Sequence, residues 1–436
     1  MTVNVIGAGL AGCEAALQLA RRGFEVRLFE QKPLRRSPAH HSDLFAELVC
    51  SNSLKAERVE SAAGLLKEEM RRLGSVCMMA AERSREAAGG ALAVDREQFA
   101  RFITDSIKSN ENITIISAEV VQIDPDTPTV VCSGPLTDGN LLDSIGRLCG
   151  HEFCSFFDAA APIVAADSID MESAVFASRD ERGGDDYINC PMNKAEYEAF
   201  YEALITAERA PMHEFESSGK VYEGCMPIEV MASRGADTIR FGPLKPVGLR
   251  DPRTGHRPWA NVQLRRENAA GTMYNLVGFQ TNLKFGEQKR VFGMIPALKN
   301  AEFYRYGVMH RNTFIDSPRV LSADLSLKAH TNVFFAGQIT GVEGYMEAAA
   351  CGIIAGINVA RRLRGEAAVV LPDYTMIGAL LGYITDGEVK DFQPMGANFG
   401  VLPPIEPHIR DKRERYAALS ARSLEWFQNF AEDVNR

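Results

Sequence analysis

The sequence predicts an α/β protein in which a doubly wound parallel sheet is interrupted by a mixed, mostly β insertion. Three observations lead to this fold class. The chain opens with a strand, a glycine-rich turn and a helix, and a similar strand–glycine–helix segment recurs near residue 333. Between these two segments lie short strand-like runs separated by glycine and proline, which is typical of an antiparallel sheet.

The N-terminal pattern is a βαβ unit. Val3–Ile6 is the first strand, a helix with regularly spaced alanine and leucine follows Gly12, Gly23 ends that helix, and Phe24–Glu30 is the second strand. Further along, the periodicity predicts helices near 59–73 and 95–108, with Asp95 as a helix cap. It also predicts strands at 113–116, 120–123 and 129–132.

From about residue 184 the pattern changes. We expect a helix near 193–208 and then strands at 238–241, 260–264, 274–280 and 290–294. A strand at 332–336, a glycine-rich turn and a helix at 345–364 restore the α/β pattern. The expected domains are therefore 1–183, the first part of a nucleotide-binding domain, 184–307, an insertion on the substrate side, and 308–436, the second part of the nucleotide-binding domain.

Composition narrows the class of protein. A chain of 436 residues with 46% hydrophobic and 24% charged residues is expected to form a soluble, two-domain globular protein. The nine cysteines include no Cys-x-x-Cys pair, which argues against a disulfide framework or a zinc site. The N-terminus lacks the basic stretch of a signal peptide, and no apolar run is long enough to span a membrane. We expect a cytoplasmic protein with no metal, no membrane association and no obligate protein partner.

The charge is distributed unevenly. The whole chain has a net charge of −9, but the segment Arg234–Arg311 carries 14 basic and 5 acidic side chains, a net +9. A basic block in an acidic protein indicates a local anionic partner, and a nucleic-acid backbone is the first candidate. A phosphorylated small molecule is the alternative.

The first glycine turn has the sequence Gly7-Ala8-Gly9-Leu10-Ala11-Gly12 between the first strand and the first helix. In this context Gly7 permits a tight turn, Gly9 lets a pyrophosphate approach the backbone, and Gly12 allows close packing of the helix. The helix N-terminus offers amide groups to phosphate, and Glu30 is placed to accept hydrogen bonds from ribose hydroxyls.

The second glycine turn distinguishes FAD from NAD. A second helix N-terminus, at Gly337, Gln338 and Tyr345, is suited to the ribityl-phosphate end of a flavin. Many flavoproteins have aspartate where this chain has Gln338, so a neutral ribityl contact is expected. The two turns together predict a glutathione-reductase-like FAD-binding domain.

Two cysteines and three ring residues are candidate site residues. Cys50 follows the second strand among small polar residues, where this fold commonly returns to the flavin ring, and Cys225 lies in a glycine- and proline-flanked turn. A free cysteine is more often a small core residue than a reactive one. His310 lies where the insertion rejoins the flavin domain, and domain junctions are common ligand sites. Phe285 and Trp259 either stack on an aromatic ligand or pack a sheet, and packing is favoured for Trp259.

These segments together resemble the folate- and FAD-dependent tRNA (uracil-5-)-methyltransferases of bacteria, along nearly the whole chain. The outer blocks are shared with the longer flavoprotein that modifies the tRNA wobble uridine, whereas EGCMPIE and GVMHRNTFI are specific. The matching blocks are VNVIGAGLAGCEAA at 3–16, AELVCSNSLK at 46–55, EGCMPIE at 223–229, VGFQTNLKFGEQKRVFGMIP at 277–296, YRYGVMHRNTFI at 304–315 and FFAGQITGVEGYMEAA at 334–349.

The resemblance implies methylation of the T-loop uridine at position 54 of tRNA. The carbon would come from methylenetetrahydrofolate, and the reducing equivalents from NAD(P)H through FAD. Cys225 matches the nucleophile that adds to C6 of uracil, and Cys50 matches the second cysteine, suited to removing the C5 proton. The two thiols could exchange roles. His310 matches the family's pterin-stacking histidine, and Phe285 stands where the family often has tryptophan.

Two alternatives remain open at this point. A related folate- and FAD-dependent enzyme could methylate a uridine of ribosomal RNA with the same chemistry. A flavin oxidoreductase acting on a small metabolite would need neither the basic block nor two loop cysteines.

Overall fold

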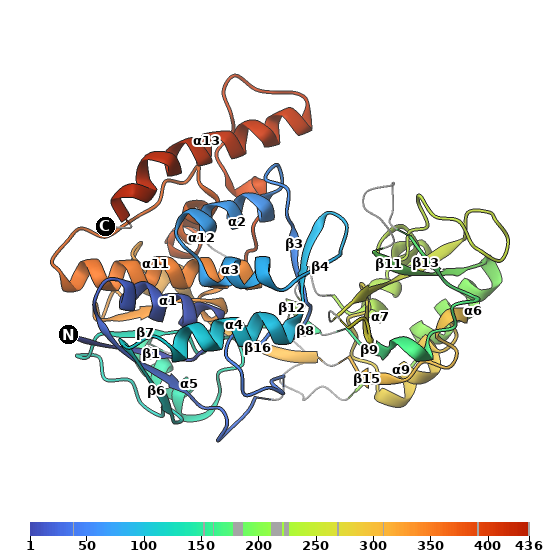
Figure 1. Ribbon diagram of the computed structural model, residues 1–436, viewed down its shortest axis with the longest axis horizontal. Helices are drawn as coiled ribbons and strands as arrows, with labels where there is room; N and C mark the ends of the chain where they lie inside the picture. Colours follow the sequence, from blue (N-terminus) through green and yellow to red (C-terminus); the bar gives the residue numbers. More distant parts are fainter. Residues whose placement is uncertain are drawn as a thin grey trace.

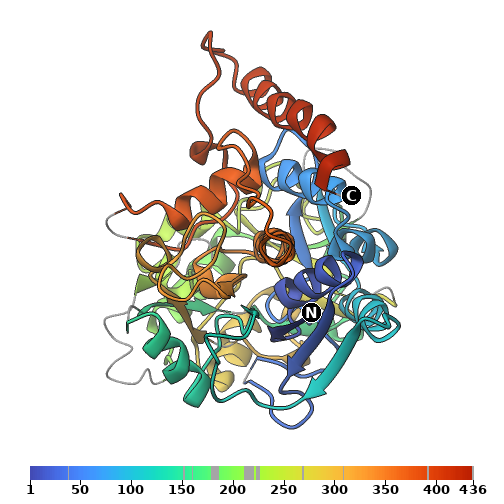
Figure 2. The same ribbon diagram turned by 90° about the vertical axis from the view of Figure 1, so that its left-hand side faces the viewer.

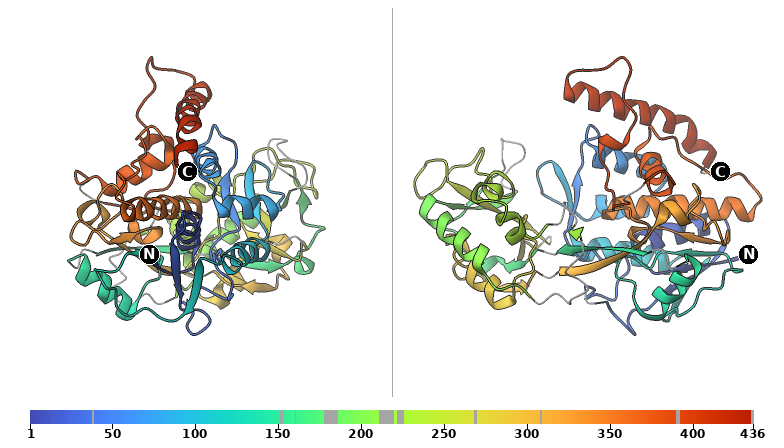
Figure 3. Two further views of the ribbon diagram at one scale, coloured as in Figure 1. Left: turned by 60° about the vertical axis from the view of Figure 1, so that its left-hand side comes forward. Right: turned by 180° about the vertical axis from the view of Figure 1, so that it is seen from behind.

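The computed structural model divides the chain into two lobes (Figure 1; Figure 3, right). The larger lobe is built from both ends of the chain, and the smaller lobe from its middle. The described residues are 1–436 without 38, 151–152, 160, 178–185, 211–219, 222–225, 268–269, 308, 390–391 and 435–436. For 153–159, 220–221, 309–311, 429 and 431–434 only the backbone is described.

A parallel sheet forms the centre of the larger lobe. Its strand order is β17-β7-β1-β2-β6, and every adjacent pair is parallel. Along each strand, alternate side chains point to opposite faces. Val5, Val130 and Phe334 join the main core, whereas Ile6 and Val131 join a smaller cluster on the other face. The strands are β1 (Thr2–Ile6), β2 (Glu25–Glu30), β6 (Ile113–Ser117), β7 (Thr129–Val131) and β17 (Val333–Phe335).

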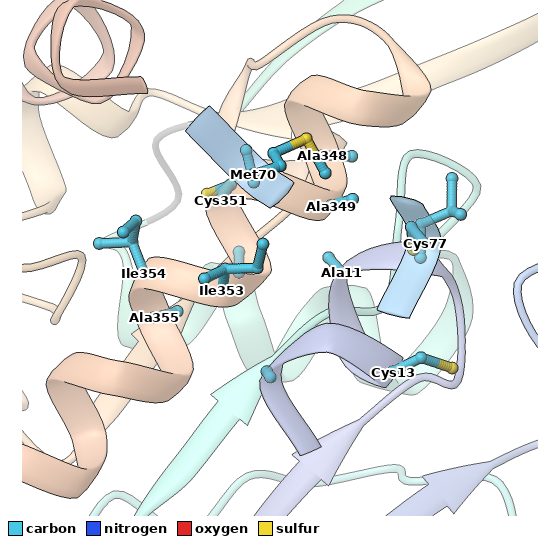
Figure 4. Close-up of a cluster of buried hydrophobic side chains, with 14 of the residues drawn as sticks. Ala11, Cys13, Met70, Cys77, Ala348, Ala349, Cys351, Ile353, Ile354 and Ala355 are labelled. Atoms are coloured by element: carbon cyan, nitrogen blue, oxygen red, sulfur yellow. The ribbon is translucent and has the colours of Figure 1, made fainter. Parts of the chain in front are cut away.

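Two helices from opposite ends of the chain cross closely over this sheet. They are α1 (Leu10–Arg21) and α11 (Tyr345–Leu363), and Figure 2 looks along α11 with α1 beside it. A Cβ at Gly352 of α11 would lie 2.2 Å from the Ala11 carbonyl oxygen, and one at Gly356 would lie 2.8 Å from that of Ala15. Figure 4 shows the alanine and cysteine side chains packed at this crossing. Small residues thus bring the two backbones into contact.

Further helices surround this core. No helix of the described residues is both long and apolar enough to cross a membrane. The C-terminal helix lies along the outer edge of the larger lobe (Figure 3). The helices are α2 (Ala62–Arg72), α3 (Val76–Arg83), α4 (Arg96–Lys108), α5 (Gly139–Leu148), α10 (Ser317–Val320), α12 (Met376–Thr385) and α13 (Lys412–Val434), and a small sheet contains β3 (Ser53–Ala56), β5 (Ala91–Val94) and β4 (Arg85–Glu86).

The smaller lobe contains a six-stranded sheet in the order β10-β11-β13-β14-β9-β15, with every adjacent pair antiparallel. Two of its strands precede residue 184, so the expected boundary at 183/184 is wrong. The short strands before it carried too little periodicity to reveal their long-range pairing. The elements are β9 (Ile163–Ala165), β10 (Val175–Phe176), β11 (Tyr187–Met192), β13 (Ala260–Arg266), β14 (Met273–Leu276), β15 (Phe303–Arg305), α6 (Lys194–Thr206), α7 (Ile228–Ala232), α8 (Ala236–Phe241) and α9 (Phe285–Phe292).

The connection between the lobes is a three-stranded sheet in the order β12-β8-β16. The strands are β8 (Phe153–Ala159), β12 (Lys220–Val221) and β16 (Met309–Ile315), and β8 pairs with β16 in antiparallel fashion along its whole length. We refer to residues 161–307 as the insertion domain and to the larger lobe as the main domain.

Most predicted elements are confirmed, but three strands are not. Residues 238–241 belong to α8 and 290–292 to α9, and 120–123 form an irregular segment. In α9 the buried residues Gln288, Val291 and Phe292 are spaced three and four apart, which is helical. The strand predicted at 274–280 ends at Leu276. Asp95 caps α4, as predicted, by accepting hydrogen bonds from the amides of Glu97 and Gln98.

The crossing of α1 and α11 leads to a matched pair of variants. Gly352→Ala adds a methyl group where the Ala11 backbone lies within 2.2 Å, so it should cost about 1–3 kcal/mol and lower the apparent Tm by several degrees. Gly382 is also helical, in α12, but its Cβ would meet nothing within 4 Å. Gly382→Ala should therefore leave the Tm unchanged or raise it, by at most about 1 kcal/mol of stability. Equal Tm values for the two variants would contradict the close crossing.

Candidate active site

The first glycine turn connects β1 to α1 at the carboxyl edge of the parallel sheet. Gly7 has a φ of 98°, and a Cβ there would lie 2.5 Å from the Cys132 carbonyl oxygen of the neighbouring strand. A Cβ at Gly12 would lie 1.8 Å from the Gly7 carbonyl oxygen, so the helix packs directly on the turn. Gly9 differs, because a Cβ there meets nothing within 4 Å. The turn is thus packed tightly on two sides and open at Gly9.

Glu30 ends β2 beside this turn and is almost fully buried. Its carboxylate accepts hydrogen bonds from the amide groups of Ala8, at 2.9 Å, and of Lys32, at 3.0 Å. These two contacts fix the carboxylate at the edge of the turn. A cavity lies at this edge of the sheet, and Glu30 lines it together with Gly9, Leu10 and Ala11.

The second glycine turn reaches this cavity from the other end of the chain. Gly337 has a φ of 85° and packs on Ala11 of α1, where a Cβ would lie 2.9 Å from the Ala11 Cβ. The Gln338 side-chain amide donates to both carboxylate oxygens of the buried Glu343, at 3.2 and 3.1 Å. Gln338 and Tyr345, the first residue of α11, both line the cavity. Two helix N-termini therefore share one cavity.

Sequence reasoning missed part of the cavity wall. Arg35 pairs with Glu119 and Asp138, at 2.6 and 2.7 Å, across one edge of it. Burial, reinforced by Lys32, lowers the pKa of His40. The carboxyl end of β7 supplies Cys132 and the residues that follow, and the general rule that ligands bind at the carboxyl ends of parallel strands could have identified them. The missed lining residues include Lys32, Arg35, His40, Glu47, Ala118, Glu119, Cys132, Ser133, Gly134, Pro135, Leu136, Thr137, Asp138 and Leu141.

Cys50 lies in the loop between β2 and β3 and is half-buried. The Tyr345 hydroxyl accepts hydrogen bonds from the amides of Cys50, at 2.6 Å, and Ser51, at 3.2 Å. The Cys50 carbonyl oxygen accepts from Arg96 and from Arg305, both at 3.0 Å. Cys50 is thereby joined to the first residue of α11, Tyr345, which also lines the cavity.

The insertion domain contacts the same loop. Arg265 donates to the Asn52 side-chain oxygen at 2.8 Å and to the Ser51 hydroxyl at 2.7 Å. Asn52 in turn donates to the Arg266 carbonyl oxygen at 2.8 Å. Arg265 is buried, so it belongs to this junction and not to a surface for an anionic partner. The basic block had suggested the opposite.

The other predicted residues differ in what the structure describes. Cys225 lies outside the described residues, and His310 lies in β16 with only its backbone described. Phe285 begins α9 and is 54% exposed. Its ring stacks on Tyr306 at 4.8 Å between centroids, and Tyr306 stacks on Phe303 at 5.0 Å. Phe285 is thus the exposed end of a three-ring stack.

Much of the basic block is neutralised within the insertion domain. Lys284 pairs with Glu208, Arg290 with Glu287, and Lys299 with Asp170. Other basic side chains of the block are exposed, and no ion pair is found for them among the described residues. They are Lys245, Arg250, Arg257 and Lys289.

The parallel sheet, its helices on both faces and the cavity between two helix N-termini define a FAD-binding fold of the doubly wound class. Residues 2–367 match the model of the family described as Glucose inhibited division protein A. GidA of Aquifex aeolicus, in its form I crystal, aligns over 99% of this chain and 76% of its own, with a TM-score of 0.71 and 20% identity, which supports the fold.

Two relatives are far more similar in sequence. The methylenetetrahydrofolate--tRNA-(uracil-5-)-methyltransferase TrmFO of Halalkalibacterium halodurans is 54% identical over 99% of both chains. The protein of the same name from Acetivibrio thermocellus is 56% identical over 98% of both. The chain belongs to the GidA family and, within it, to the TrmFO group.

The open space at Gly9 fits a cofactor phosphate and leads to a prediction. Gly9→Val should fold, because its Cβ meets nothing in the protein, yet it should lose bound flavin, because the side chain projects from a wall of the cavity. Gly90→Val, at another exposed glycine with no neighbour within 4 Å, should keep its flavin. Flavin content is measured by absorbance after denaturation, and folding by circular dichroism. A folded Gly9→Val protein with a normal flavin load would contradict the assignment.

Proposed function

We propose that this protein methylates C5 of the T-loop uridine, position 54, of tRNA. Methylenetetrahydrofolate is the carbon donor, and NAD(P)H supplies the reducing equivalents through FAD. The observation that carries the proposal is the loop of Cys50, which Tyr345 ties to the N-terminus of a helix that lines the cofactor cavity. Its support from sequence is the identity of 54% and 56% to two enzymes named for this reaction.

The cavity residues fit FAD. The amides at the α1 N-terminus and the open face of Gly9 would hold the pyrophosphate, and Glu30 the ribose. Gly337, Gln338 and the N-terminus of α11 would hold the ribityl end. When bound, reduced flavin supplies the one-carbon carrier and the hydride, chemistry that amino-acid side chains lack.

The two cysteines divide the work on uracil. C5 of uracil is a poor nucleophile until a thiolate adds at C6, which moves the ring's electron pair toward C5. Cys225 is assigned this step, and breaking its bond to C6 at the end restores the thiolate. Cys50 is assigned the removal of the C5 proton, which forms an S–H bond and leaves the C–H electron pair on the uracil.

The folate is assigned to the aromatic stack. Phe285 offers one ring face to solvent, while its other face rests on Tyr306 at 4.8 Å. A preformed stack loses little freedom when a further planar ring is added, so a pterin gains stacking energy at small entropic cost. His310 lies in β16, four positions after Tyr306 in the sequence, and is assigned to the same site.

The tRNA surface is assigned to the exposed side of the insertion domain. Lys245, Arg250 and Arg257 lie in the segment that follows α8, and in the same part of the sequence the side chains of Phe241 and Val247 are exposed. Cationic side chains beside an exposed aromatic ring suit a phosphate backbone with unpaired bases. Methylation of a ribosomal RNA uridine with the same chemistry is the second candidate, favoured by the same surface.

An in vitro methylation assay tests the reaction. The purified protein with NAD(P)H and methylenetetrahydrofolate should methylate a tRNA transcript, and a transcript with cytidine at position 54 should receive no methyl group. Omitting methylenetetrahydrofolate should abolish the product. Cys50→Ala and Cys225→Ala should each lower the rate by at least about 100-fold, as expected for loss of a general base or a nucleophile. Methylation of a ribosomal RNA fragment but not of tRNA would select the second candidate.

The two cysteine variants separate when the target base is 5-fluorouridine, because fluorine cannot leave as a proton. Cys50→Ala should still form a denaturation-resistant RNA adduct through Cys225, whereas Cys225→Ala should form none. The reverse result would exchange the two roles.

Charge reversal tests the tRNA surface. The double variant Lys245→Glu/Arg250→Glu should weaken tRNA binding and reduce the slope of log K against log salt by about 1–2, one unit for each lost phosphate contact. Flavin content should not change. The control is Lys108→Glu. Lys108 is exposed at the C-terminal end of α4, about 18 Å along the helix from Arg96, which contacts the Cys50 loop. Equal weakening by the control, per charge reversed, would contradict a localised surface.

A further inference from the structure

The loop Leu48–Asn52 is held by arginines from both domains. Arg96 of α4 donates to the carbonyl oxygens of Leu48 and Cys50, the latter at 3.0 Å. Arg305 of β15 donates to those of Val49 and Cys50, both at 3.0 Å. With Arg265 on the Ser51 and Asn52 side chains, three guanidinium groups surround five consecutive residues.

Acidic side chains compensate only part of this charge. The Glu267 carboxylate accepts from Arg96 at 2.5 Å, and both side chains are largely buried. Tyr345 also contacts the loop, and burial raises its pKa, so it is neutral, while Lys32 and Glu47 just before the loop pair with each other at 3.8 Å. Further out, Arg266 pairs with Glu86 at 3.9 Å and Lys55 with Glu347 at 2.7 Å, so these charges balance. The loop therefore accepts hydrogen bonds from three guanidinium groups, and among the described residues only Arg96 of the three has an ion pair, with Glu267.

An excess of buried positive charge is unfavourable unless an anion accompanies it. Arg305 Nε, a buried donor, and Glu267 Oε1, a buried acceptor, have no hydrogen-bond partner in the described structure, so the cluster is not fully satisfied by its own members. Burial lowers the pKa of Arg265 and Arg305, and the ionised forms of Glu267 and Cys50 oppose that shift. The Cys50 carbonyl oxygen accepts from both Arg96 and Arg305, so the side chain of the same residue lies in the field of these guanidinium groups.

The other described cysteines lie in a different environment. All six are buried, and burial raises the pKa of each thiol. Cys50 is half-buried and has guanidinium groups on its own carbonyl oxygen. The six buried cysteines are Cys13, Cys77, Cys132, Cys149, Cys190 and Cys351.

We propose that Arg96, Arg265 and Arg305 are positioning residues that hold Cys50 as a thiolate at neutral pH. Two of the three arginines, and Glu267, belong to the insertion domain, so the environment is complete only when that domain is docked. The role of the thiolate as the acceptor of the C5 proton rests on the proposed function. Its ionisation does not, because it follows from the arginine cluster alone.

The ionised sulfur is the form that can accept a proton, since a thiol already carries one. Lowering the pKa increases the thiolate fraction but weakens the base, and the best compromise lies near the working pH. One carboxylate among three guanidinium groups serves that compromise. Glu267 would keep the positive field from lowering the pKa of Cys50 too far.

The test is the pH dependence of iodoacetamide alkylation, measured on the flavin-containing protein by mass spectrometry of the peptide that carries Cys50. The midpoint should lie at least about one unit below the ordinary thiol value of about 8.5. Arg305→Gln should raise the midpoint, and Arg305→Lys, which keeps the charge, should restore most of it. Glu267→Gln, which is isosteric, should lower it further and accelerate labelling at low pH.

The opposite signs distinguish an electrostatic role from a structural one, because loss of structure would change both variants in the same direction. A wild-type midpoint at or above 8.5, or shifts of equal sign in Arg305→Gln and Glu267→Gln, would overturn the proposal. No folate, NAD(P)H or RNA enters this measurement. A low midpoint in a protein that fails to methylate tRNA would refute the proposed function and leave the thiolate standing.

Discussion

The close crossing of α1 and α11 is the contact on which the rest of the structure depends. Two helices that begin more than 300 residues apart meet backbone to backbone, because Gly352 lies over Ala11 with no side chain between them. A larger residue at this crossing would separate the two helix N-termini. Their dipoles and unpaired amides act over only a few ångströms, so the cavity needs both ends at that spacing. The same crossing sets the position of Gly337 against α1.

The charge of the insertion domain has two separate physical uses. Part of it is exposed or paired at the surface, as with Lys284 and Glu208. The other part, Arg265 and Arg305, is directed inward onto the Cys50 loop of the other domain. A net charge counted along the chain combines the two. Arg265 and Arg305 use their guanidinium donors on the Cys50 loop, so these donors are not free to contact an RNA phosphate.

The sequence predicted what is set by local rules. A tight turn requires glycine, and a helix that begins after it exposes amides, so Gly7, Gly9 and the first βαβ unit could be read directly. Residues whose role depends on distant partners could not. Arg96 looks like a solvent-facing residue in the first turn of α4, yet its partner Glu267 lies 171 positions away. Residues 290–294 were mistaken for a strand because this short window contains only part of the spacing of Gln288, Val291 and Phe292 that marks the buried face of α9.

Tyr345 connects these separate features. As the first residue of α11 it lies at the helix end that the crossing with α1 positions, and its hydroxyl accepts the amide hydrogens of Cys50 and Ser51. The opposite side of Cys50, its carbonyl oxygen, is held by Arg305 from the insertion domain. A single peptide segment is therefore fixed between the cofactor helix and the docked insertion. Any displacement of either domain must move the thiol or break one of these hydrogen bonds, so the geometry of the cavity and the geometry of Cys50 are set together.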